Sequence, residues 1–284
     1  MSIQKLRIVC ISDTHNAAPG EGYTLPRGDI LIHAGDLTNQ GSSTELHKAL
    51  AWLRKADFAI KIVVAGNHDL ALDERFPSQN DEAAELRRVA KTDSNFCYSE
   101  HESVTLTLRG MMLKVFGSPY SLASSGKPWA FRYAAEEGEQ LWSAIPSDTT
   151  ILVSHTPPAG HVDESAHWIR GGCAALHDAL RRVKPRLHVC GHCHEGRGGE
   201  IIHWSDGQAE EEVTQWQDPG AGGNKKQSLF DLTSKSRGGY GLRGGEQTAV
   251  VNASIMAKSY GRGGKAFNKP IVVDMELPHG GGGA

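Results

Sequence analysis

The sequence has neither an excess of charge of one sign nor a long hydrophobic segment. In its 284 residues, 30 Lys and Arg stand against 33 Asp and Glu, giving a net charge of −3. This balance disfavours a nucleic-acid binder, because neutralising a phosphate backbone takes clustered basic residues. No apolar run approaches the roughly 20 residues that span a bilayer, and the start lacks a signal peptide's apolar core. We therefore expect a cytoplasmic protein without membrane contact or a stable nucleic-acid complex.

Cysteine is also scarce. The five cysteines are scattered and odd in number: Cys10, Cys97, Cys173, Cys190 and Cys193. This pattern is typical of a reducing compartment rather than of a disulfide framework. A chain of this length buries roughly three quarters of its unfolded surface, so it forms a core without cross-links. Histidine and glycine, in contrast, are frequent, with 14 and 33 residues.

Short apolar runs alternate with segments of helical periodicity. We expect strands at 7–12, 30–33, 60–65, 150–154, 187–190, 248–255 and 270–277, with a further short strand at 201–204. We expect helices at 43–55, 80–90, 134–144 and 173–183, the first with Ser43 as its N-cap. Segments 104–108 and 112–117 flank Arg109 and Gly110 and predict a β-hairpin. Strands followed by crossover helices indicate an α/β fold with parallel strand pairs.

Residues 196–247 interrupt this alternation. The segment is rich in glycine and charge, and its few apolar residues offset little of the entropy lost on ordering. We therefore expect one domain over 1–284, with a mobile insertion at about 205–246 and a flexible glycine tail at 279–284. Removal of 206–245 should then leave a folded protein.

Five of the expected strands are each followed immediately by residues of types that can bind metals. They are Asp13 and His15, then Asp36 after Gly35, then Asn67, His68 and Asp69 after Gly66, then His155, and finally His192 and His194 after Gly191. In open α/β sheets, ligands bind at the carboxyl ends of strands, where the loops emerge. One such motif alone is more often a turn or a cap. Five in this order predict that the side chains converge in one crevice.

The converging residue types suit two divalent ions. Imidazole suits zinc and iron, whereas carboxylate and amide oxygens suit harder ions such as manganese. A carboxylate has two oxygens, so a single Asp can bridge two ions. Two ions about 3.5–4 Å apart can clamp a phosphoryl group and activate a water. The residues thus favour metal-assisted chemistry on a phosphate.

In this motif order the sequence resembles the calcineurin-like metallophosphoesterase superfamily. Segments 154–163, 185–198 and 251–254 also resemble its metallophosphoesterase-domain-containing subgroup, which includes brain and adrenal members. The resemblance covers about 5–200 and 248–277. It implies a four-layer αββα sandwich of two mixed β-sheets flanked by helices.

The resemblance also implies a role for each site residue. Asp13, His15 and His194 would hold one ion, and Asn67, His155 and His192 the other. Asp36 would bridge both ions, which would be manganese, iron or zinc. His68 would face the leaving group as a catalytic residue, and Asp69 would orient His68.

The implied activity is hydrolysis of a phosphodiester, cyclic nucleotides among the candidates, by a metal-bridging hydroxide. The expected partner is therefore a small phosphate ester. Two alternatives remain open: a phosphomonoesterase acting on nucleotides, and a catalytically weak nucleotide-binding scaffold on the same fold. The sequence leaves the oligomeric state open.

Cys190, Cys193 and His194 also match two other motifs. The C-x-x-C-H pattern is the haem attachment signature, and C-G-H-C is a thiol redox motif. A redox pair needs its first cysteine at a helix N-terminus, but the glycine-rich stretch 196–199 follows, so we favour simple packing of these thiols.

For several other residues, the sequence gives weaker evidence of a role at the site. His33 and His161 are candidate substrate contacts, whereas His188 has the alternating pattern of a core histidine. We favour core packing over base stacking for Trp129. Asn252 lies in a turn near the C-terminal end of the sequence, and we expect this residue to lie beside the metal site.

Overall fold

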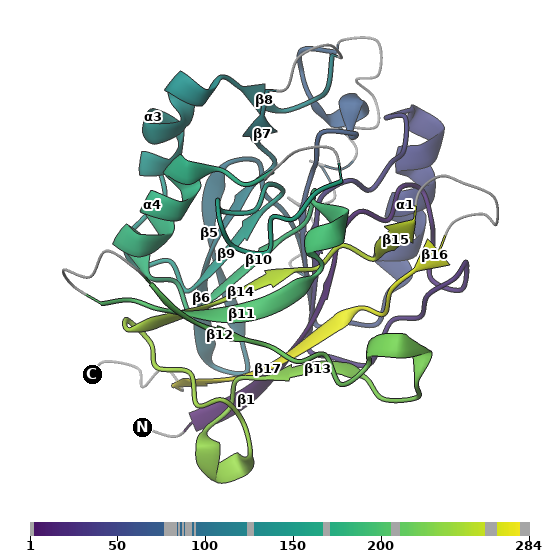
Figure 1. Cartoon of the computed structure of the whole chain (residues 1–284). Coiled ribbons are helices and arrows are strands. Elements are labelled where there is room, and N and C mark those ends of the chain that lie inside the picture. Colours follow the sequence, from purple (N-terminus) through teal and green to yellow (C-terminus); the bar gives the residue numbers. More distant parts are fainter. Residues whose placement is uncertain are drawn as a thin grey trace.

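The computed structural model consists of two β-sheets that face each other, with helices on both outer faces (Figure 1). It describes residues 3–76, 84, 86, 88, 93, 95–123, 128–166, 171–205, 211–258 and 266–278. The layers are therefore helix, sheet, sheet and helix, as the resemblance implied. The expected α/β sandwich is confirmed.

The first sheet has six strands in the order β13-β17-β1-β2-β3-β4. Its strands are β1 (Ile3–Ile11), β2 (Ile30–Ala34), β3 (Ile60–Val64), β4 (Phe96–Tyr98), β13 (Ser228–Asp231) and β17 (Ile271–Pro278). Strands β1 to β4 run parallel, while β17 pairs antiparallel with β1. The carboxyl ends of β1, β2 and β3 thus lie along one edge.

The second sheet has seven strands in the order β12-β11-β14-β10-β9-β6-β5. Its strands are β5 (Glu102–Leu108), β6 (Met111–Ser118), β9 (Ile151–Ser154), β10 (Leu187–Cys190), β11 (Gly198–His203), β12 (Glu212–Gln215) and β14 (Gln247–Asn252). β5 and β6 form the predicted antiparallel hairpin, and β6, β9, β10 and β14 run parallel. Two small pairs complete the strands: β7 (Ser121–Leu122) with β8 (Arg132–Tyr133), and β15 (Met256–Lys258) with β16 (Ala266–Phe267).

The helices occupy opposite sides of the sandwich. They are α1 (Ser43–Lys55) against the first sheet, and α3 (Gly138–Ser143) and α4 (Ala174–Val183) against the second (Figure 1). The N-cap of α1 is Ser42, one residue before the predicted Ser43, because Ser42 forms a reciprocal capping box with Glu45. The helix expected at 80–90 falls largely outside the described residues. Within the described ranges, no helix is both long and apolar enough to cross a bilayer.

Side chains of β1 alternate between the two sides of its sheet, as the strand period of two requires. Ile8 faces the core between the sheets, whereas Val9 packs with Leu46 of α1 on the outer face. On the second sheet, Leu152 of β9 packs outward against Leu180 of α4. Three apolar layers therefore hold the four structural layers together.

The segment expected to be a mobile insertion is partly built into the sandwich. β12 forms an edge of the second sheet, and β13 an edge of the first. The rings of Trp216 and Phe230 stack with centroids 5.3 Å apart in the core between the sheets. The segment has few apolar residues, but those it has are buried, so the expectation that 206–245 is dispensable does not fit this packing. Residues 206–210 and the tail 279–284 lie outside the described ranges.

Candidate metal centre

The carboxyl ends of strands from both sheets meet at one place. The loops after β1, β2 and β3 come from the first sheet, and those after β9 and β10 from the second. Ser12, just after β1, forms a parallel bridge with Ser254, just after β14, and its carbonyl accepts the amide of Ile255 at 3.1 Å. This bridge joins the edges of the two sheets beside the predicted site residues.

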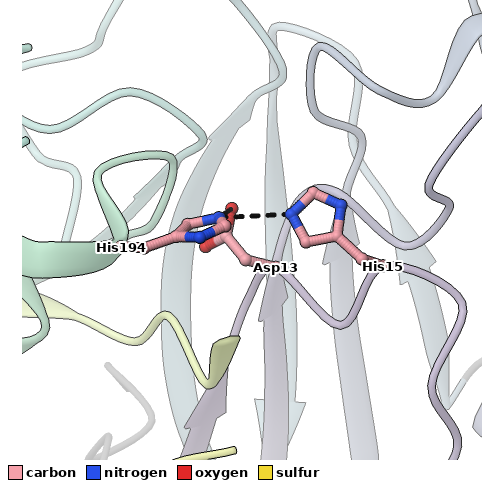
Figure 2. Close-up of side chains that lie close together, drawn as sticks. All are labelled: Asp13, His15 and His194. Carbon is pink, nitrogen blue, oxygen red and sulfur yellow. Dashed lines mark hydrogen bonds and ion pairs between the residues drawn. The ribbon is translucent and has the colours of Figure 1, made fainter. Parts of the chain in front are cut away.

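Asp13, His15 and His194 form the first group at this edge. The Nε2 atoms of His15 and His194 lie 3.2 Å apart, and the His194 Nε2 is 3.5 Å from Asp13 Oδ1. Figure 2 shows Asp13 and His15 arriving from the end of β1, and His194 from the opposite side. Residues 179 positions apart thus offer ligand atoms to a common point.

Asn67, His155 and His192 form the second group. The His155 Nε2 lies 3.0 Å from Asn67 Oδ1 and 3.2 Å from His192 Nδ1. The other ring nitrogen of His155 donates to the carbonyl of Ala34 at 2.9 Å. A carbonyl only accepts, so Nδ1 carries the proton in the neutral ring and Nε2 presents its lone pair.

Asp36 lies between the two groups. Its Oδ1 is 3.4 Å from the Nε2 of His155, and its Oδ2 is 3.8 Å from the Nε2 of His15. The carboxylate is 2% exposed and also accepts the amide of His68. The Nε2 lone pair of His155 faces the oxygens of Asn67 and Asp36 at 3.0 and 3.4 Å, an arrangement that a shared cation would stabilise. The donor set therefore fits two ions with Asp36 between them.

The backbone at these residues is held in an uncommon conformation. Asp13, His15, Asp36 and His192 have positive φ angles of 54°, 42°, 55° and 68°. Non-glycine residues rarely adopt this region, and such strain clusters at functional sites. Hydrogen bonds hold the first two loops together, since Asp13 N donates to Gly35 O and His15 N donates to Asp36 O.

One glycine is required by close packing at the centre. A Cβ on Gly191 would lie 1.7 Å from Ser12 Oγ and 2.5 Å from Asp13 Oδ2. The amide of Gly191 donates to the carbonyl of His155 at 3.0 Å. The backbone of the loop that carries His192 can therefore approach Asp13 only without a side chain at this position.

Burial sets the protonation of two histidines of the centre, His15 and His192. It lowers the pKa of His15 to about 4 and that of His192 to about 3. Both rings are therefore neutral near pH 7, with a nitrogen lone pair available for a metal. Burial alone would raise the pKa of Asp13, but the hydrogen bond and charge of His194 hold it well below its usual range. Burial alone would lower the pKa of His194, but the hydrogen bond with Asp13 raises it. The centre thus offers charged carboxylates together with the neutral imidazoles of His15 and His192.

His68 lies at the rim of the centre, and its ring is not oriented by Asp69 as expected. The His68 Nδ1 donates to the carbonyl of Asn39 at 2.6 Å, while its Nε2 is 4.0 Å from Asp36 Oδ2. Asp69 is fully buried and accepts bonds from the amides of Leu37, Thr38 and Gly66 and from the Thr38 hydroxyl. Asp69 therefore braces the loops that carry Asp36 and Asn67.

Three further residues lie in the surroundings of the site, and of these Asn252 was expected there. Asn39 supplies only a main-chain carbonyl, which leaves no signal in the residue type. The ring centroid of Trp129 lies 4.3 Å from that of His68 and the side chain is partly exposed. This aromatic is therefore at the rim of the site and not in the core, where it was expected. Asn252 donates to the carbonyl of Cys193 at 2.7 Å and to that of Val162 at 2.9 Å, which supports the loop that carries His192 and His194.

The remaining candidates have other contacts. His33 lies 3.0 Å from the hydroxyl of Thr14 beneath the first loop, and His188 contacts Ser154 in the core. His161 pairs with Glu200 and Glu211. Cys190 and Cys193 are buried free thiols whose pKa values burial raises, which opposes thiolate redox chemistry.

Comparison with known proteins places the geometry in a wider context. A family model described as calcineurin-like phosphoesterase matches residues 6–196. Human metallophosphoesterase domain-containing protein 1 is 31% identical, over 96% of this chain and 72% of the human protein. The Caenorhabditis elegans UPF0046 protein K07C11.7 is 36% identical, over 68% of this chain and 65% of its own. A protein of Emericella nidulans named probable rhamnogalacturonate lyase C is 43% identical, over 70% of this chain but only 18% of its own.

Proposed function

The chain belongs to the calcineurin-like phosphoesterase family, and we propose that it hydrolyses phosphodiesters at a centre of two divalent ions. The observation that carries the proposal is the position of Asp36 between two groups of nitrogen and oxygen ligands. Asp13, His15 and His194 would hold one ion, and Asn67, His155 and His192 the other, with Asp36 shared. Imidazole with carboxylate suits manganese, iron or zinc.

The chemistry divides between the ions and the chain. Two bound divalent ions would supply Lewis-acid polarisation of the phosphoryl group. The chain keeps the ligand atoms in place, because the Ala34 carbonyl fixes the His155 ring and Asp69 fixes two of the loops. The substrate is then oriented by a rigid frame rather than by mobile side chains.

His68 would hold and transfer the proton for the leaving group. Its Nδ1 is committed to the Asn39 carbonyl, so Nε2 is the nitrogen that remains for the substrate. This side chain is 21% exposed, more than the 6% of His15, which suits contact with an incoming molecule. Proton transfer by a positioned histidine contributes about 10²–10⁴-fold to a rate.

Trp129 supports a substrate with an organic substituent beside the leaving group. Its ring lies against that of His68 and is partly exposed. An aromatic face there can contact a nucleobase or another flat group, so small phosphodiesters, cyclic nucleotides included, are the first class to try. The five free cysteines support action in a reducing compartment such as the cytoplasm.

The test compares two model substrates on protein loaded with Mn²⁺ and of known metal content. We expect bis-p-nitrophenyl phosphate to have a higher kcat/KM than p-nitrophenyl phosphate. Asp36→Asn should abolish turnover of both, whereas Cys193→Ser should retain it. A preference for the monoester would favour the phosphomonoesterase, and absence of bound metal and turnover would favour a scaffold.

A further inference from the structure

A second cluster of metal-binding side chains lies apart from the centre described above, and we propose that it is a zinc site. Its members are His161, His177 and Glu211, whose ligand atoms all lie within 4.8 Å of one another. None of the three belongs to the dinuclear ligand set. The site therefore does not depend on the proposed phosphodiesterase activity.

The spacing of the three side chains fits one small cation. The Oε2 of Glu211 lies 3.0 Å from the Nε2 of His177 and 3.2 Å from the Nε2 of His161. Zinc binds nitrogen and oxygen at about 2.0–2.2 Å in tetrahedral geometry, which separates neighbouring ligand atoms by about 3.3 Å. The rings of His161 and His177 are stacked, with centroids 5.1 Å apart, so both present their edges to the same carboxylate.

A carboxylate on the far side of His161 orients its ring. The Nδ1 of His161 donates to Glu200 Oε1 at 2.6 Å, and Glu200 accepts in turn from Gln215 at 2.6 Å. Metal-binding histidines commonly donate their second nitrogen to a carboxylate in this way. The contact fixes the proton on Nδ1 of a neutral ring and directs the Nε2 lone pair toward Glu211.

Burial distinguishes this cluster from an ordinary surface group. The side chains of His161, Glu211 and His177 are 8%, 11% and 19% exposed. Two imidazoles with one carboxylate make a zinc ligand set that leaves a fourth position open. Arg181 pairs with the other oxygen of Glu211. This leaves Oε2 of Glu211 for the ion.

The position of the cluster indicates a structural role. His177 lies on α4, His161 lies in the loop after β9, and Glu211 immediately precedes β12. An ion there would tie the start of the 211–246 segment to the helix layer. Because the ion binds the folded chain only, it would raise the stability of the protein.

The alternative is an ion-pair cluster in which the histidines carry protons instead of a metal. Burial lowers the pKa of His161, but Glu200 and Glu211 raise it more, so a protonated ring is the direct competitor of zinc. Zinc needs neutral imidazole, and its binding therefore releases protons. Measuring the number of zinc ions per chain distinguishes the zinc site from the protonated ion-pair cluster.

The experiment measures zinc per chain by mass spectrometry after equilibration with Zn²⁺ at pH 7.5 and desalting. We expect His177→Ala and Glu211→Gln each to hold one zinc ion fewer than the wild type. His47→Ala, which removes an exposed histidine of α1, should match the wild type. Circular dichroism confirms folding of each variant, and Glu211→Gln serves where the alanine variant fails to fold.

The outcomes are distinct from those of the dinuclear centre. In an Asp36→Asn background, adding His177→Ala should still remove one zinc ion per chain, whatever the dinuclear centre retains. Equal zinc content in the wild type, His177→Ala and Glu211→Gln would overturn the site and leave the ion-pair cluster. A failure of phosphodiesterase activity has no bearing on this count.

Discussion

The Nδ1 of His155 donates a hydrogen bond of 2.9 Å to the main-chain carbonyl of Ala34, the last residue of β2. His155 follows β9 of the second sheet, so a side chain from one sheet is oriented by the backbone of the other. The bond fixes the tautomer and presents Nε2 to Asn67 and Asp36. The candidate ligand set therefore assembles only when the two sheets are packed together.

Replacing His68 by Ala should lower turnover of a phosphodiester with an alkyl leaving group about 10²–10⁴-fold while leaving metal content near that of the wild type. The physical reason is that His68 assists the leaving group and is not in the proposed ligand set. The loss should be small for p-nitrophenolate, which leaves without a proton, and large for an alkyl leaving group. The check is steady-state kinetics on one phosphodiester with a p-nitrophenolate leaving group and one with an alkyl leaving group, together with analysis of the bound metal. Loss of the bound ions in the variant would show that His68 is a ligand.

Gly191→Ala should disrupt the centre without any change of polarity. The new Cβ would lie 1.7 Å from Ser12 Oγ, so the loop carrying His192 must move away from Asp13. We expect a loss of about 1–3 kcal/mol in the free energy of unfolding and a reduced metal content. The matched control is Gly198→Ala, whose Cβ would meet its nearest neighbour at 3.7 Å. Equal metal content in the two variants would contradict this account of the loop.

Asp274 predicts a pH-dependent contribution to stability. Its carboxylate is 1% exposed and accepts two bonds of 2.7 Å from Arg7, with Lys5 also at 2.7 Å. Burial alone would raise its pKa, but these cations lower it below the ordinary 3.8. The stabilisation is therefore present above pH 3.8 and is lost as the pH falls through the lower folded value.

The test is urea unfolding of Asp274→Asn from pH 7 to pH 2. At pH 7 the variant should be less stable by about 1–3 kcal/mol, and the difference should shrink below about pH 4. Asp148→Asn, which breaks an exposed pair with Lys114, should change little. A difference that does not vary with pH would argue against the ion pair as its cause.

Phe230→Ala tests whether the 211–246 segment belongs to the core. Phe230 is fully buried and contacts the rings of Trp216 and Tyr240, both at 5.3 Å between centroids. We expect a loss of about 3–5 kcal/mol in the free energy of unfolding, measured by chemical denaturation. The control is Met112→Ala at a side chain that is 64% exposed. A loss of stability no larger than that of Met112→Ala would indicate that the segment is a dispensable insertion.

The sequence predicted the parts of this molecule that depend on local pattern. The apolar runs at 30–33 and 187–190 lie in β2 and β10, because strands buried on both faces are apolar throughout. The helix at 43–55 matches α1, because its burial is periodic. The strand-end motifs also identified residues that lie together. What the pattern could not show is the contact of a main-chain carbonyl, as at Asn39, since every residue type supplies one. Nor could it show the burial of Phe230, because isolated aromatics in a glycine-rich segment have no period.

The pairing of His161 with Glu200 shows a further limit. The two residues lie 39 positions apart, and His161 stands only six residues after His155. Proximity in sequence suggested the substrate pocket, whereas the fold directs the ring toward β11 and α4. Such partners become visible only once the sheet order is known.

The most direct test of the central claim is anomalous diffraction at the manganese edge, on crystals of protein loaded with Mn²⁺. The account predicts two peaks, about 3.5–4 Å apart, on either side of the Asp36 carboxylate. One peak should adjoin Asp13, His15 and His194, and the other Asn67, His155 and His192. A single peak, or peaks that do not touch Asp36, would contradict a centre of two ions bridged by that residue.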